Sequence, residues 1–188
     1  MAKALLITTT DIKKYSILNG NIDNDKFIQY IEIAQDIHIQ NYLGTDLLEK
    51  IQSLLPTDID LVENDKYKIL LNSFVKPMLI HWSLVEILPF MAYTVANGGI
   101  YKHTSESSTN ADKNEIDFLV EKERSIAENY TRRFIDFMRF NLDDYLEYSS
   151  NTNNDIKPNR NADFGGWYLG GGNNCSESDY WGVGKSGL

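Results

Sequence analysis

The stretch of residues 78–93 is apolar on nearly every side, and this feature constrains the fold more than any other. Its apolar members are Met78, Leu79, Trp82, Val85, Ile87, Leu88, Phe90 and Tyr93. Arranged on a helix, they leave no polar face, and a helix of that kind is normally the central one of a bundle. The sequence therefore predicts an all-α fold, a helical bundle of five or six helices packed around this segment.

The same stretch is a poor membrane span. The apolar run over residues 77–96 approaches the length that crosses a bilayer, but it contains His81, Glu86 and two prolines. The first seven residues hold only a short apolar run and do not resemble a secretory signal. From a length of 188 residues, 42% of them hydrophobic, we expect one soluble body plus a tail and no membrane contact.

Start and stop signals place the other helices. Hydroxyl and carboxylate side chains at residues 8–11 suit a helix N-cap, and the dipeptide Asn19-Gly20 ends that helix. A second helix is expected from about residue 25 to Gly44, a third up to Pro56, and a fourth helical region from about residues 60–64. The last helix is expected to be the longest, from about residue 111 to residue 148.

The distal half of that last helix carries more apolar surface than one core needs. Its aromatic and aliphatic side chains cover roughly 240° of the circumference, whereas a core-facing stripe needs only about 100°. We therefore expect a subunit interface that includes Phe137, Phe140, Arg132 and Arg133, with the arginines forming ion pairs either within the helix or between subunits. The alternative is that the chain's own tail wraps the end of the helix.

Residues 149–188 change character and are expected to form an extended Gly/Asn-rich tail, separate from a helical domain of residues 1–148. This segment holds eight of the twelve glycines. It also holds two aromatic pairs, Trp167-Tyr168 and Tyr180-Trp181, which are expected to act as partner-binding anchors on a mobile tether. The alternative is a loop packed on the chain's own domain.

No pattern of catalytic residues is visible in the sequence. There is no phosphate-binding glycine loop, zinc-protease motif or nucleophile elbow. His38 and His81 lie on apolar faces and are expected to be hydrogen-bonded structural histidines, and His103 to be solvated. Cys175 is the only cysteine and has no nearby cation to activate it. We expect no enzyme, no cofactor and no metal site.

The N-terminal part of the chain resembles phage head–tail connector proteins, also called adaptor or head-completion proteins. The resemblance rests on the Thr-rich cap at residues 7–15, on residues 25–28, on the segment Ile-Glu-Ile-Ala-Gln at residues 31–35, and on the exit Tyr42-Leu43-Gly44. It is nearest to the connector-ring proteins of crAss-like phages. It covers residues 7–148 in architecture but only about residues 7–55 in motif, and the tail with its aromatic pairs is not a general feature of that family.

This resemblance implies a structural virion protein. It would form a homo-oligomeric ring, commonly a dodecamer, that binds the portal and further tail or ring proteins at the head–tail junction, after assembly in the host cytoplasm. The net charge of −9 predicts that double-stranded DNA passes through the ring without specific binding. The alternatives are a small phage regulatory or host-binding protein that uses its aromatic tail as a peptide ligand, and an enzyme of unrecognised type.

Overall fold

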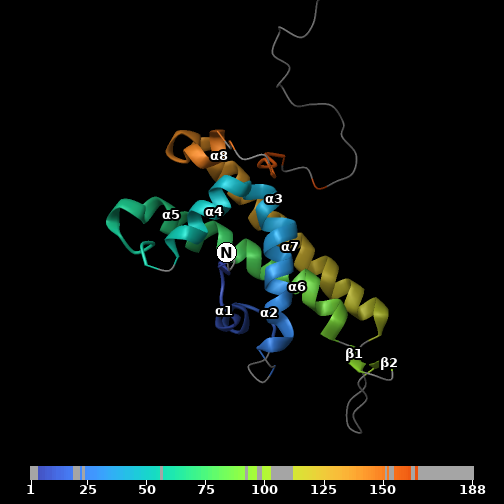
Figure 1. Ribbon diagram of the computed structural model, residues 1–188. Helices are drawn as coiled ribbons and strands as arrows, with labels where there is room; N and C mark the ends of the chain where they lie inside the picture. The colour runs from blue at the N-terminus through green and yellow to red at the C-terminus, as the bar shows by residue number, and fades with distance from the viewer. Residues whose placement is uncertain are drawn as a thin grey trace, which may run out of the picture.

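The computed structural model describes residues 4–18, 22, 24–55, 57–91, 93–96, 99–102, 112–150, 152, 155–161 and 164. The described chain is mostly helical, which confirms the expected fold class in its broad form (Figure 1). The α-helices are α1 (Thr9–Tyr15), α2 (Asp25–Ala34), α3 (Gln40–Leu43), α4 (Thr45–Leu54), α5 (Asp65–Leu70), α6 (Lys76–Met91), α7 (Lys113–Phe140) and α8 (Leu146–Ser150).

The N-terminal segment is fixed at both of its ends. Thr8 and Asp11 form a capping box at the start of α1, which confirms the cap expected from the sequence. Ahead of it, the side chain of Gln35 accepts a hydrogen bond of 2.9 Å from the Leu6 N–H and donates one of 3.2 Å to the Ala4 carbonyl. The buried amide of Gln35 therefore holds the chain entry against the second helix.

Two of the helices contain a π turn. Residues Gln35–Ile39 join α2 to α3 as a π turn, and the resulting helix ends at Gly44, whose positive φ of 76° is easily reached only by glycine. Residues Leu71–Val75 join α5 to α6 in the same way, and the Lys76 N–H bonds to the Leu71 carbonyl. Proline cannot donate and clashes with a carbonyl in a regular α-helix, so this wider turn lies directly ahead of Pro77.

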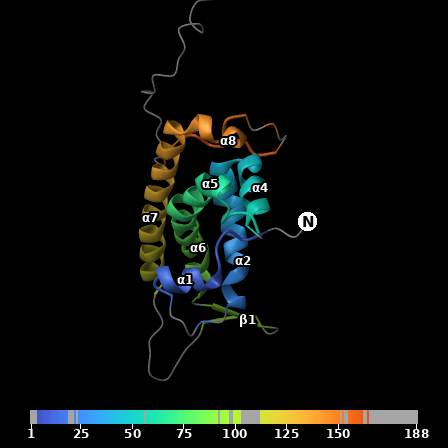
Figure 2. The ribbon, with the colours of Figure 1, turned by 90° about the vertical axis from the view of Figure 1, so that its left-hand side faces the viewer.

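Helix α6 is the central helix, as expected. It contacts α1, α2 and α7, and α2 and α7 flank it on opposite sides (Figure 2). Trp82 is buried in this packing. The helical run Val62–Met91 is long and apolar enough to cross a membrane by composition, but more than half of its most apolar window is buried inside the protein, as in the core helix of a soluble protein.

The expected single helix over residues 111–148 is interrupted. Helix α7 ends at Phe140, a 3-10 turn follows at Leu142–Asp144, and α8 begins at Leu146. The turn directs the rings of Tyr145 and Tyr148 into the core. The wide apolar arc expected for the distal half assumed one straight helix, and the change of direction after Phe140 accounts for part of it.

A short antiparallel hairpin was not expected. Strand β1 (Tyr93–Ala96) pairs with β2 (Gly99–Lys102), and Ala96 is the partner of Gly99. The helix expected to run to Tyr93 therefore ends at Met91. The intervening sequence, Asn97-Gly98, is the dipeptide most typical of two-residue hairpins.

The chain beyond α8 is not separate from the body where the structure describes it. The Thr45 N–H donates to the Ile156 carbonyl at 3.0 Å, and the Asn159 N–H donates to the Asn41 carbonyl at 2.8 Å. The Arg139 guanidinium donates to the Arg160 carbonyl at 2.9 Å. Residues 155–161 therefore dock along α3, α4 and the end of α7, while the expected domain boundary after residue 148 stays a prediction. This docking agrees with the alternative in which the tail wraps the helix end.

Candidate functional site

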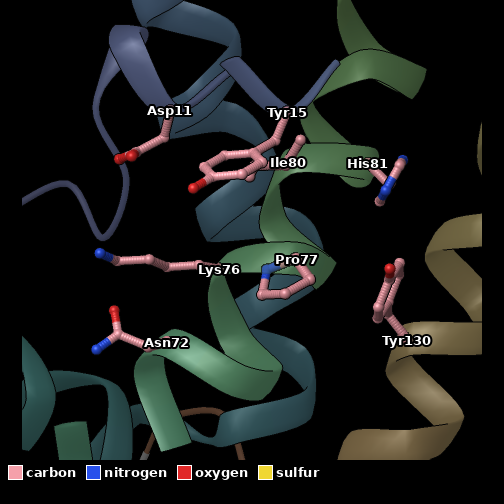
Figure 3. Close-up of a pocket in the computed structure, with 8 residues that line it drawn as sticks. All are labelled: Asp11, Tyr15, Asn72, Lys76, Pro77, Ile80, His81 and Tyr130. Carbon is pink, nitrogen blue, oxygen red and sulfur yellow. The ribbon is translucent and has the colours of Figure 1, made fainter. Parts of the chain in front are cut away.

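A pocket opens between α1, α6 and α7 (Figure 3). Its volume is about 480 Å³. The lining residues are Asp11, Tyr15, Asn72, Lys76, Pro77, Ile80, His81 and Tyr130. The turn Leu71–Val75 and the first turns of α6 supply its base, while α1 and α7 supply opposite walls.

One end of the pocket is built by a histidine–carboxylate pair. His81 Nδ1 lies 2.7 Å from Glu123 Oε2 on α7, and the Glu123 side chain is almost completely buried. The Tyr130 ring stacks on the imidazole, with centroids 5.3 Å apart and planes inclined by 10°. Because a carboxylate accepts, Nδ1 is the nitrogen that carries the proton, and the other nitrogen, Nε2, stays available as a second hydrogen-bonding atom.

The other end is polar and open. In Figure 3, Asp11, Lys76 and Asn72 lie on the side of the pocket away from His81 and Tyr130. The Asp11 carboxylate is already engaged, since it accepts from both the N–H and the hydroxyl of Thr8 at 2.9 Å. Between the two ends, the Tyr15 ring lies opposite Pro77, with Ile80 behind them.

These groups suit binding by stacking and hydrogen bonding. The lining residues include no serine, threonine or cysteine nucleophile. In the part of the chain that the structure describes, no group of three or more His, Cys, Asp or Glu side chains is placed to hold a metal ion. The arrangement can therefore hold a flat, partly polar ligand between an aromatic ring and an aliphatic surface.

A second histidine pair lies on the far side of α6 from the pocket. His38 Nε2 is 2.9 Å from Glu86 Oε1, and the imidazole stacks on the Trp82 indole with centroids 3.9 Å apart. Burial lowers the pKa of His38 below its usual value, and this outweighs the hydrogen bond to Glu86, which raises it. Both histidines are hydrogen-bonded, as expected from the sequence.

The residues predicted for a subunit interface lie in different environments. Phe137 is partly buried and stacks on Phe74 of its own chain, with centroids 4.2 Å apart, and its place in a subunit interface stays a prediction. Phe140 is 91% exposed, and its place in an interface stays a prediction. The guanidinium of Arg133 lies over Phe74, and that of Arg132 lies over Phe164. Among the described residues neither arginine forms an ion pair within the chain, and an ion pair with another subunit stays a prediction.

The four predicted anchors Trp167, Tyr168, Tyr180 and Trp181 lie outside the described residues, as does His103. The sequence analysis missed the pocket entirely. Tyr15, Asn72, Lys76 and Tyr130 come from four elements, α1, the turn Leu71–Val75, α6 and α7, and no motif links them. Only the position of His81 in an apolar helix gave a signal, and it did not identify Glu123 as the partner.

The described chain is mostly helical and has a pocket between α1, α6 and α7. The chain belongs to DUF6712, a family of unknown function, whose family model matches residues 39–158. The match extends through α8 into the docked segment that begins at residue 155. No curated protein and no solved structure matches the chain.

Proposed function

We propose that this protein is a structural component of a phage virion. Copies of it assemble into a ring of about twelve that joins the portal to the tail and surrounds the DNA channel. The proposal places the protein at the head–tail junction of the virion, after assembly in the host cytoplasm, and gives it no catalytic activity. The resemblance of residues 7–55 to connector proteins supports it, as does the arrangement of exposed apolar side chains.

The observation that carries the proposal is a set of exposed apolar side chains on the two helices that flank α6 on opposite sides. On α7, Phe118 is 70% exposed and Phe140 is 91% exposed. They are 22 positions apart, which at about 100° per residue places them within roughly 40° of each other on one side of the helix. Along the second helix, Ile33 and Ile37 are four positions apart, and both are exposed.

A subunit with different contact surfaces on two opposite sides can bind one neighbouring copy with each surface, and the same contact then repeats from copy to copy. If the α7 face of one copy binds the α2 face of the next, each copy has two neighbours, and the contact closes into a ring when its rotation allows. Phe118 and Phe140 lie about 33 Å apart along α7, with Lys122 and Asp136 on the same side between them, so the proposed contact combines two separate apolar side chains with polar groups.

The length of α7, the C-terminal segment and the net charge also fit the proposed ring. Helix α7, with 28 residues, is about 42 Å long and forms one side of the subunit. Residues 165–188, with their aromatic pairs, are proposed to contact an adjacent copy, the portal or the next ring or tail protein. The net charge of −9 favours passage of double-stranded DNA without adhesion.

The mass of the protein in solution tests the proposal. Light scattering and native mass spectrometry are expected to show an oligomer, alone or with portal protein. The variant Phe140→Asp should lower that mass, because it places a charge in a desolvated contact. The matched control is Val62→Asp, at a position that is 85% exposed on a different element, and it should leave the mass unchanged.

Two results would overturn the proposal. One is a strict monomer that does not bind the portal. The other is the absence of the protein from purified virions, where it is expected at about the copy number of the portal. A monomer whose C-terminal segment binds a host factor would instead support the regulatory or host-binding function.

A further inference from the structure

The pocket between α1, α6 and α7 contains unused hydrogen-bonding groups at both ends. Lys76 and Asn72 lie at the open end, and His81 Nε2 and the Tyr130 hydroxyl lie at the other. Within the described residues, none of these groups has a hydrogen-bond or ion-pair partner in its own chain. Polar groups that surround a partly apolar pocket and remain unpaired are typical of a binding site.

The middle of the pocket is shaped for a ring. The Tyr15 ring faces the Pro77 ring across the pocket, and Ile80 closes the back (Figure 3). A volume of about 480 Å³ leaves room for one large aromatic side chain and the backbone beside it. An indole or phenol buries a large apolar area while keeping one polar atom at its edge, so it fits both the apolar middle and the hydrogen-bonding ends.

We propose that this pocket binds the segment Asp179-Tyr180-Trp181 of a second copy of the chain. The proposal rests on the ring function above. The Trp181 or Tyr180 ring enters between Tyr15 and Pro77, with its polar edge toward His81. The carboxylate of Asp179 then lies on the side of the Lys76 ammonium, which gives the pair opposite charges.

The length of chain beyond the docked segment favours Tyr180-Trp181 over Trp167-Tyr168 as the aromatic pair that binds the pocket of a second copy. The described chain ends at Phe164, which contacts Tyr42 and the Arg132 guanidinium. Trp167 follows three residues later, within about 10 Å, which is no more than the diameter of one helix. Trp181 follows after 17 residues and reaches up to about 56 Å, enough to leave its own subunit.

The position of Phe164 favours a neighbouring copy over the chain's own pocket. On α7, Arg132 and Tyr130 point about 200° apart, so Phe164 and the pocket lie on different sides of this helix. To reach the pocket of its own chain around the solvent side of α7, the segment after Phe164 would have to cross the face that carries Phe118 and Phe140. In the proposed ring, the next copy covers that face. Phe164 also adjoins α3, the continuation of the α2 helix whose face meets the neighbour.

Disulfide trapping tests which copy is bound. In a Cys175→Ser background, Asn72→Cys places a thiol at the pocket mouth and Gly182→Cys places one beside Trp181. When the two single variants carry tags of different size and are mixed, we expect a cross-linked heterodimer on a non-reducing gel. Ser53→Cys, exposed on α4, replaces Asn72→Cys as the control and should give none. The absence of a heterodimer, or cross-linking only within one chain when both cysteines are in one molecule, would overturn the proposal.

Peptide binding tests the pocket independently of the ring. A labelled peptide of residues 176–184 is titrated into full-length protein that carries Trp181→Ala, and its fluorescence anisotropy is followed. We expect binding that weakens at least tenfold with Tyr15→Ala or Lys76→Ala, or with a peptide that lacks the Trp181 side chain. Lys157→Ala, at an exposed position of the docked segment, should have no effect. If the peptide binds but the protein forms no oligomeric ring, the proposed function fails while the peptide-binding pocket stands. If the protein forms the oligomeric ring but its pocket does not bind the peptide, this inference fails while the proposed function stands.

Discussion

The indole N–H of Trp82 on α6 donates a hydrogen bond of 3.1 Å to Thr131 Oγ1 on α7. The Thr131 hydroxyl in turn donates to the Ala127 carbonyl at 2.8 Å, one turn earlier on α7. The same indole also stacks on the imidazole of His38, which lies in the π turn that joins α2 to α3. One side chain thus connects the central helix to both of the helices that flank it.

Loss of the Trp82 side chain should be among the most damaging single changes. Trp82→Ala is expected to lower the free energy of unfolding by about 3–5 kcal/mol, because it leaves a cavity between three helices. Thr131→Val keeps the volume but leaves the indole N–H unpaired, and it should cost about 1–3 kcal/mol. Urea unfolding followed by circular dichroism measures both values. A Trp82→Ala protein as stable as the native one would contradict the central position of α6.

The stability should decrease as the solution becomes acidic, in part because of His38. Its imidazole faces Trp82 and Glu86, with Arg124 nearby, and its pKa lies below the ordinary value of 6.5. The unfolded chain therefore binds more protons at this residue, and stability falls as the pH drops through 6.5 toward the lower pKa of the folded state. Above pH 6.5 the contribution is fully present.

The measurement compares urea unfolding at pH 8, 6.5 and 5.5 for the native protein and for His38→Gln. The carboxylates titrate in both proteins, so the difference between the two profiles isolates the histidine. The native protein should lose more stability between pH 8 and 5.5 than the variant does. Equal losses in the two proteins would show that His38 does not titrate differently on folding.

Phe137 and Phe140 should respond in opposite ways to the same substitution. Phe137→Asp places a charge against Phe74 and Tyr145 inside the subunit, where the ring centroids lie 4.2 and 6.2 Å away. It is expected to cost several kcal/mol, roughly as for other unpaired buried charges, and to reduce the helical circular dichroism. Phe140→Asp should leave the helix content and melting temperature nearly unchanged. If both variants lose helicity equally, Phe140 also packs in the subunit core.

Truncation should distinguish the docked segment from the chain that follows it. A protein ending after residue 148 lacks the hydrogen bonds from Thr45 to Ile156 and from Asn159 to Asn41. We expect it to be less stable than a protein ending after residue 164 by on the order of 2 kcal/mol, from several net hydrogen bonds. Thermal melts of both truncated forms and of the full chain measure this. Identical melts would support the boundary after residue 148 that is expected from the sequence.

Features encoded within a few residues could be predicted from the sequence. The cap at Thr8, the end of a helix at Gly44 and the burial of Trp82 follow from local side-chain chemistry and from helical periodicity. The turn after Phe140 could not be read in this way, because Tyr145 and Tyr148 keep an apparent helical spacing. Tertiary contacts determine the positions of these two side chains. The Tyr145 hydroxyl donates to the Lys66 carbonyl at 2.9 Å, and the Tyr148 ring contacts Phe134 edge-on.

The pocket was beyond sequence reasoning for a related reason. Tyr15, Lys76 and Tyr130 are separated by more than fifty residues at each step, and each is unremarkable in its own helix. The docked segment could be predicted only as the alternative that was not favoured, since its glycine- and asparagine-rich surroundings indicated a free tail. Most of its hydrogen bonds involve side chains, for example Asp155 accepting from Gln40 and Thr45. These partners lie more than 100 residues away in the sequence, so no local pattern reveals them.

The π turn ahead of Pro77 sets the rotational phase of the whole of α6. It accommodates one more residue per turn than a regular helix does, so a deletion of a single residue within Leu71–Val75 would restore uniform α-helical geometry. Every side chain after it would then turn by about 100° around the axis relative to α5. Trp82 would leave Thr131 and His81 would leave Glu123, so a chain shorter by one residue here could not keep the same neighbours on both sides. Insertions and deletions are therefore far less tolerable at this point than a substitution of any one of its side chains.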